Sequence, residues 1–304
     1  MPSRLASSMV TDAVATCLAI KFTASYCHRL GSGAGVILSV DELLLLTEIL
    51  EANGLSRPDK FFRPGKSNFD RLVALFSAID ADNRDVVFDL IRNYDIINQY
   101  RDHLFNLLLQ VSQIHTGNIA LFPLAPFDDD RIKSGDHVFY ELKSLANPDF
   151  DGRFVFFDTP DSKDLLQSDL PKYAVDDFIG TGEQFLEMVG KMVSSNSAAK
   201  VTGALTIAIM ESGKAAIESK GMVAVHEVLK RKAIDGYLRD AGKNVELFYA
   251  RYDALESHLA VSQAQKRGWQ GSEALVSMKR TPNNTLPIFW HRGRERKWPA
   301  PFPR

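Results

Sequence analysis

The chain has 304 residues, of which 45% are apolar and 24% charged, and its formal net charge is −2. This composition is typical of a folded globular protein and excludes a collagen-like chain, a disordered chain and a small disulfide-rich scaffold. The near-neutral total also argues against general binding to nucleic acid or to anionic membranes. The charge is unevenly distributed, however. Residues 279–304 contain seven Lys or Arg and one Glu, so this tail carries +6 and the rest of the chain −8.

The first part of the chain, residues 1–116, predicts an all-helical module. Ser39 and Glu42 form a capping-box pattern before a Leu-rich run, and Asn53-Gly54 is a typical helix stop. Gly65-Lys66-Ser67 lacks the spacing of a phosphate-binding P-loop and is interpreted as a loop that caps a helix. Apolar residues then recur at helical spacing in three stretches, 69–79, 86–91 and 104–111.

The cellular compartment is inferred from cysteine content and hydropathy. Two cysteines, Cys17 and Cys27, are too few for a disulfide framework and wrongly spaced for a zinc ribbon. The small-residue stretch 14–20 is only weakly apolar and does not resemble a signal peptide. All apolar runs are far shorter than the roughly 20 residues of a membrane helix. We therefore expect a cytoplasmic protein without a membrane segment.

After residue 117 the pattern changes to short apolar runs that alternate with amphipathic stretches. This alternation is typical of a parallel sheet covered by helices. The predicted strands are 119–124, 154–157, 173–175, 205–210 and 222–228. The predicted helices are 136–145, 183–194, 213–220 and 231–263, the last broken near Gly242. We expect an α/β domain over 117–304 behind the helical module of 1–116, with a Pro- and Trp-rich tail from about 265 to 304.

The segment that carries chemistry follows the predicted strand 173–175. Two adjacent carboxylates, Asp176 and Asp177, are followed by a Gly-Thr-Gly loop at 180–182 and then by an amphipathic helix. Ligands of open α/β sheets bind at the carboxyl ends of strands, and a helix N-terminus favours an anion. Carboxylates beside a phosphate cradle would repel a bare anion, so they need sugar hydroxyls or a magnesium ion to bind. A phosphorylated ribose satisfies both halves of the pattern.

This segment resembles the phosphoribosyl-diphosphate motif of type I phosphoribosyltransferases. The resemblance implies that Asp176 and Asp177 hold the ribose hydroxyls, directly or with Mg²⁺. It further implies a loop for the 5′-phosphate, formed by Gly180, Thr181, Gly182, Glu183 and Gln184. Gln184 departs from the usual Thr, which weakens one expected phosphate contact. Gly180 stands where the oxopurine-salvage members of the family have an Asp that acts as a general base. Oxopurines are therefore not the favoured substrate class.

The flanking sequence extends the resemblance over roughly residues 118–304. Residues 119–124 resemble the first core strand of that fold, and the stretch 159–172 resembles the connection that often closes over the substrate. The ends TPNNTLPIFW (281–290) and WPAPFPR (298–304) resemble a phosphoribosyltransferase-like group of bacterial conflict and antiphage systems (PRTase-CE-like). The predicted pyrophosphate-side loop contains Arg131, Lys133, Ser134 and Gly135.

The resemblance implies binding of Mg²⁺-phosphoribosyl diphosphate or a related ribose-5-phosphate ligand, in a bacterial defence setting with a protein partner encoded nearby. The sequence assigns no catalytic residue, because phosphoribosyl transfer needs no protein nucleophile. Two alternatives stay open at this stage. One is a non-catalytic subunit that senses a nucleotide or binds a partner in a defence complex. The other is an effector directed at nucleic acid through the basic tail, although a tail folded back on the acidic body is the interpretation we favour.

Overall fold

The computed structural model describes residues 38–54, 67–125, 134–150, 152–293 and 297–304. The chain divides into two compact units. Unit 1 comprises the described residues of Met1–Asn93 together with those of Arg292–Pro301. Unit 2 comprises Tyr94–His291 and Phe302–Arg304. The tail that was predicted from the sequence is therefore shared, with its larger part in unit 2.

The helices of unit 1 begin where the sequence predicts caps. The described helices are α2 (Val40–Ala52), α3 (Asn68–Ser77) and α4 (Arg84–Ile91). The Ser39 hydroxyl accepts a hydrogen bond from the Glu42 amide, and the Glu42 carboxylate accepts one from the Ser39 amide, so the predicted capping box is confirmed. Ser67 caps α3 in the same way, which confirms that it is a helix cap.

A five-stranded parallel sheet organises unit 2. Its strands are β2 (Ile119–Pro123), β3 (Phe154–Phe156), β4 (Lys172–Ile179), β5 (Gly203–Met210) and β6 (Val223–Lys230). The order across the sheet is β3-β2-β4-β5-β6, and all four pairings are parallel. β2, β4 and β5 are apolar along most of their length because helices cover both faces of a parallel sheet.

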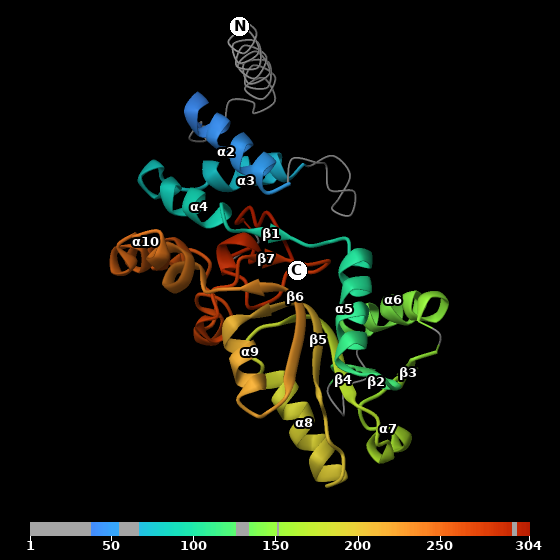
Figure 1. The fold of residues 1–304 in the computed structure, drawn as a ribbon. Helices are drawn as coiled ribbons and strands as arrows, with labels where there is room; N and C mark the ends of the chain where they lie inside the picture. Colours follow the sequence, from blue (N-terminus) through green and yellow to red (C-terminus); the bar gives the residue numbers. More distant parts are fainter. Residues whose placement is uncertain (1–37, 55–66, 126–133, 151, 294–296) are drawn as a thin grey trace, which may run out of the picture. The chain divides into compact units, whose positions relative to one another are not determined.

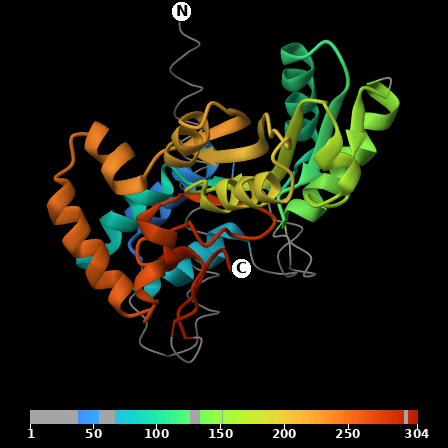
Figure 2. The same ribbon diagram turned by 90° about the horizontal axis from the view of Figure 1, so that it is seen from below.

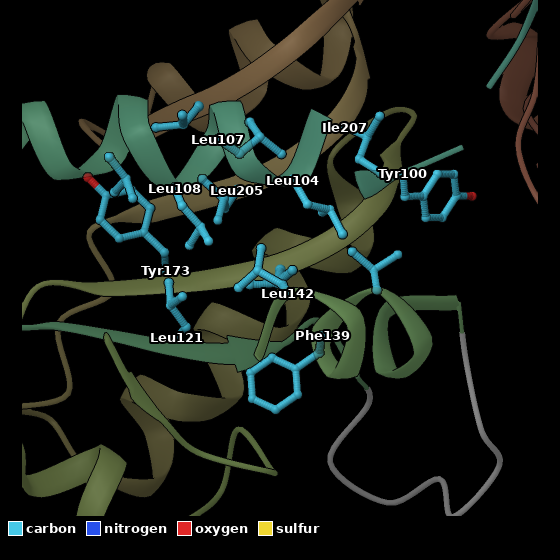
Figure 3. Close-up of a cluster of buried hydrophobic side chains, with 14 of the residues drawn as sticks. Tyr100, Leu104, Leu107, Leu108, Leu121, Phe139, Leu142, Tyr173, Leu205 and Ile207 are labelled. Carbon is cyan, nitrogen blue, oxygen red and sulfur yellow. The ribbon is translucent and has the colours of Figure 1, made fainter. Parts of the chain in front are cut away.

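Helices cover both faces of the sheet of unit 2 (Figure 1; Figure 2 shows the same ribbon from below), and a buried apolar cluster lies on each face. On one face, α5 (Arg101–Ile114) and α6 (Ser134–Asp149) contribute to one buried cluster. Figure 3 shows its side chains, with Leu104 and Leu108 of α5 beside Leu205 of the sheet. The other cluster joins the sheet to α7 (Lys163–Gln167), α8 (Glu183–Ser195) and α9 (Glu211–Glu218).

The remainder of unit 2 follows β6. A π-helix (Ala233–Leu238) leads to α10 (Val245–Ser257), and Gly242 lies between them with a φ of 71°, so the predicted break is confirmed. A two-residue parallel pair joins β1 (Asp95–Ile96) to β7 (Val276–Ser277). The C-terminal Phe302 is buried and stacks on Tyr94, with ring centroids 4.7 Å apart. The end of the chain is therefore packed into the core of this unit.

The expected fold class is confirmed: a parallel α/β sheet flanked by helices, with a helical N-terminal region. One strand differs from its prediction, since β4 continues through both aspartates to Ile179 and does not end at Val175. Backbone pairing with β5 continues past both aspartates, so the change of side-chain polarity does not end the strand. The domain division at residue 116 stays a prediction. The contacts place α5 with the sheet in unit 2.

Among the described helices, none combines the length with the apolar character that crossing a membrane requires.

Glu256 of α10 allows a test of the packing around the C-terminal segment. Its side chain is 3% exposed, and its Oε1 accepts the Arg267 amide at 2.8 Å and the Tyr252 hydroxyl at 3.1 Å. Burial raises the pKa of this carboxyl above its ordinary value. A raised pKa in the folded state means that the group favours folding at low pH and loses that contribution as pH rises through the folded-state pKa.

We therefore expect Glu256→Gln to gain stability relative to wild type as the pH rises from about 4 to about 7. Urea unfolding across this pH range measures the difference in free energy of unfolding. Glu246→Gln, at an exposed acid of the same helix, controls for the change in net charge. If the free energy of unfolding of Glu256→Gln relative to wild type does not change with pH, burial does not raise the pKa of the Glu256 carboxyl and the prediction is wrong.

Candidate functional site

The predicted acid pair lies where the sheet divides. β2 pairs with β3 on one side and β4 on the other, and its last pair with β4 is Pro123 with Val175. β4 then continues to Ile179 with β5 as its strand partner. Asp176 and Asp177 occupy this overhang, at the carboxyl end of the sheet and at its topological switch point. Ligands of open α/β sheets bind at this position.

Asp177 is tied to two distant parts of unit 2. The side chain is 5% exposed, and its Oδ2 accepts a hydrogen bond of 3.0 Å from the hydroxyl of Tyr100, just before α5. The same hydroxyl accepts the Lys279 amide at 2.9 Å. Burial, and then the charge of Asp177, raises the pKa of Tyr100 far above its ordinary value. The phenol therefore stays protonated and acts as the donor to the carboxylate.

Asp176 faces the beginning of α6. It is 7% exposed, and its Oδ1 accepts the Asp177 amide at 2.8 Å. A Cβ atom on Gly135 would lie 3.4 Å from that oxygen and 3.3 Å from the Val175 carbonyl oxygen. Glycine at this position lets the first turn of α6 approach the acid. Of the predicted pyrophosphate-side loop, Gly135 is thus placed beside Asp176, and Ser134 is the first residue of α6. Arg131 and Lys133 lie outside the described residues.

The predicted phosphate loop leads directly into α8. Gly182 is the N-cap of this helix, with a φ of 82° that favours glycine, and it lies against the Gly213 carbonyl. Gly180 and Thr181 are half-buried, whereas Glu183 and Gln184 in the first turn are exposed. The N-cap residue Gly182 has no side chain with which to cap the N-terminus of α8. Its first amide groups therefore point out of the helix without a side-chain acceptor at the cap, as an anion-binding terminus requires.

The C-terminal segment reaches this loop, which the sequence did not predict. The Gln270 amide nitrogen donates to both carboxylate oxygens of Glu183, at 2.9 and 2.8 Å. The side-chain amide of Asn284 lies against Gly180, in the space that a Cβ atom would need. Asn284 lies within the terminal motif 281–290, but no local pattern indicates that it or Gln270 meets the loop, because both contacts arise from long-range packing. The same is true of Tyr100.

Lys279 shows how one charge of the basic tail is used. Its ammonium group donates to Glu141 of α6 at 2.6 Å and lies 3.0 Å from the ring nitrogen of His137. It also lies over the Tyr100 ring, 4.3 Å from the centroid. This tail charge meets an acid of the body of unit 2, as the sequence interpretation expected.

Asp176 and Asp177 are the acidic groups of the site that could contribute to a metal centre. Among the described residues, no group of three or more His, Cys, Asp and Glu side chains is arranged to hold a metal ion. The two neighbouring carboxylates Asp176 and Asp177 offer only part of a coordination shell. Carboxylate oxygens, together with phosphate oxygens and water, are the ligands that Mg²⁺ prefers, so each acid is of the right chemical type for such an ion.

The contact between Gly180 and Asn284 predicts a steric effect. Gly180→Ala adds a Cβ atom that collides with the Asn284 amide, so we expect the free energy of unfolding to fall by about 1–3 kcal/mol. Gly190→Ala is the control within α8, since no atom lies within 4 Å of the added Cβ. This control should be neutral or stabilising by up to about 1 kcal/mol. Urea unfolding measures both; equal stability of Gly180→Ala and wild type would contradict the contact.

Comparisons with known proteins bear on the family. No curated protein sequence matches the chain. Among solved structures, orotate phosphoribosyltransferase from Aeropyrum pernix is 19% identical, with a TM-score of 0.31 over 65% of this chain and 99% of that chain. The model of the PRTase-CE family matches residues 84–304, which is more than two thirds of the chain. The chain therefore belongs to the PRTase-CE family, and the phosphoribosyltransferase-like resemblance of its sequence is confirmed.

Proposed function

We propose that unit 2 binds phosphoribosyl diphosphate, or a related ribose-5-phosphate ligand, together with Mg²⁺. Asp176 and Asp177 would hold the ribose hydroxyls, and the loop 180–184 would hold the 5′-phosphate. The observation that carries the proposal is a pair of buried carboxylates at the switch point of the sheet, followed at once by a glycine-capped helix. Membership of the PRTase-CE family supports it.

The proposal that the acids bind ribose hydroxyls is based on the hydrogen bonding that a buried carboxylate requires. Such a group is stable only when hydrogen-bond donors surround it. One oxygen of Asp177 already accepts a hydroxyl, that of Tyr100, so the environment of this acid suits O–H donors. Vicinal hydroxyls of a sugar offer the same chemistry.

The phosphate half depends on α8. This helix has 13 residues, and its dipole places partial positive charge at the amides of the first turn. Gly182, in the left-handed conformation, turns the chain into that helix without a side chain over its end. A phosphate group bound there would accept from backbone amides, so the departure of Gln184 from the usual Thr would remove a side-chain contact but no backbone contact.

Magnesium would be held by the carboxylates of Asp176 and Asp177 with the oxygens of the ligand. When bound, it would neutralise charge on the pyrophosphate group. If the protein is catalytic, the bond from C1′ to pyrophosphate breaks and a bond to the acceptor forms. The residues of this chain would then orient the ribose and stabilise charge that develops on its ring. In a non-catalytic protein the same pocket would sense a nucleotide. We place either activity in the cytoplasm, in an antiphage system with a protein partner.

Calorimetric titration of phosphoribosyl diphosphate, with and without Mg²⁺, tests the pocket. Asp177→Asn keeps an oxygen that can accept the Tyr100 hydroxyl but removes the charge, so we expect the fold to persist and affinity to fall by about tenfold or more. Glu218→Gln, an exposed acid at the far end of α9, is the matched control and should bind as wild type does. Absence of binding by wild type, or equal binding by Asp177→Asn, would refute the assignment.

Pyrophosphate release separates an enzyme from a sensor once binding is established. Wild type and Asp177→Asn are incubated with phosphoribosyl diphosphate, Mg²⁺ and a panel of bases and nucleic acids. Release by wild type that Asp177→Asn reduces indicates transfer. Binding without release across the panel indicates a sensor.

A further inference from the structure

Two stretches of the C-terminal segment form one structure beside the phosphate loop, which we call the C-terminal clasp (residues 267–274 and 283–286). Backbone hydrogen bonds join them: the Trp269 amide donates to Asn283 at 2.8 Å, and the Ala274 amide donates to Asn284 at 2.9 Å. The Leu286 amide returns a bond of 3.1 Å to Ala274. The two stretches are therefore held together.

The clasp contacts both ends of the phosphate loop. At the first residue of the loop, the buried Asn284 places its side-chain amide against Gly180 and donates to the Ser272 hydroxyl at 3.2 Å. At the first turn of α8, the Gln270 amide donates to both oxygens of Glu183. The loop residues between these contacts are consequently bounded by side chains that come from about 90 residues later in the sequence.

The backbone of the clasp is strained at three residues whose side chains form hydrogen bonds to other elements. Arg267, Gln270 and Glu273 have φ values of 55°, 53° and 53°, a left-handed conformation that only glycine adopts without steric cost. Arg267 is paired with Asp253 of α10 at 2.5 Å. Glu273 accepts the Ile234 amide at 2.9 Å and the Tyr249 hydroxyl at 2.6 Å. Gln270 thus attaches the clasp to α8, and Arg267 and Glu273 attach it to α10, with Glu273 also bonded to the π-helix Ala233–Leu238.

Gln270 also bonds to the one acidic side chain of the phosphate loop, Glu183, whose charge would repel a bound phosphate. Glu183 is negatively charged and lies in the turn where the proposed 5′-phosphate would bind, so the two groups repel one another. The Gln270 amide donates to both carboxylate oxygens and fixes where this charge lies. Glycine at 270 would remove the backbone strain but also this contact.

We infer that Gln270 and Asn284 are positioning residues of the phosphate loop. Asn284 fixes the loop at Gly180, and Gln270 holds the Glu183 carboxylate away from the bound phosphate. The role of the ligand in this inference rests on the proposed function. The positioning of the loop does not, and can be measured without a ligand.

Hydrogen–deuterium exchange of the ligand-free protein tests the positioning. We expect Gln270→Ala and Gln270→Gly to increase exchange at the amides of residues 180–186 by about tenfold, while the amides of β5 keep their protection. Gln270→Gly should melt at or above the wild-type temperature, because glycine accepts the left-handed backbone. Gln263→Ala, at an exposed glutamine of the same segment, is the control. Unchanged exchange at 180–186 in both Gln270 variants would overturn the positioning role.

Titration of phosphoribosyl diphosphate tests the electrostatic part. Gln270→Glu places a second carboxylate against Glu183 and should weaken binding by about tenfold or more. The double variant Gln270→Glu with Glu183→Gln reverses the hydrogen bond at wild-type net charge, and we expect it to recover affinity to within about threefold. Lack of recovery would overturn the role assigned to Gln270. If wild type does not bind, the proposed function fails, whereas the exchange result still decides whether the clasp positions the loop.

Discussion

The unequal length of β2 and β4 is the constraint on which the site depends. β2 ends its pairing at Val175, whereas β4 continues to Ile179 against β5. The chain leaves β2 through α6 and leaves β4 through α8, and these helices belong to opposite faces of the sheet. The divergence opens the sheet at its carboxyl edge, where Asp176 and Asp177 lie. The first turn of α6 and Tyr100 both pack against these acids.

Burial of the acid pair links the site to the stability of unit 2. A carboxylate inside an apolar core is costly unless hydrogen bonds compensate for the lost hydration. Tyr100 supplies such a bond to Asp177, and the Lys279 amide donates to the same phenol oxygen. Tyr100, Asp177 of β4 and Lys279 of the C-terminal segment are thereby joined by hydrogen bonds. A substitution at the site will consequently also change the stability of unit 2. Variants that retain the hydrogen-bond geometry therefore separate an effect on binding from an effect on folding.

The part of the C-terminal tail that belongs to unit 2, residues 265–291 and 302–304, is packed into that unit. The indole N–H of Trp290 donates a hydrogen bond of 2.7 Å to the Thr285 carbonyl oxygen, and Phe302 is buried. Basic residues of the tail are used internally: Lys279 pairs with Glu141, and Arg304 lies 5.4 Å from the centre of the Trp290 ring. These contacts favour a tail that completes the domain. They give no support to a tail that serves as a free nucleic-acid arm.

The sequence alone determined the α/β class, the positions of the five strands and the family. Each of these depends on local patterns, namely apolar runs, helix caps, and the motif of two acids followed by glycines. It also predicted the break at Gly242, since glycine is the residue that adopts positive φ without strain. It ended β4 too early, because a switch to polar side chains does not interrupt backbone pairing with β5. Only the tertiary structure brought Tyr100, Gln270 and Asn284 to the predicted site. Their contacts join residues about 75 to 105 positions apart, and such long-range packing has no signature in the local order of residues.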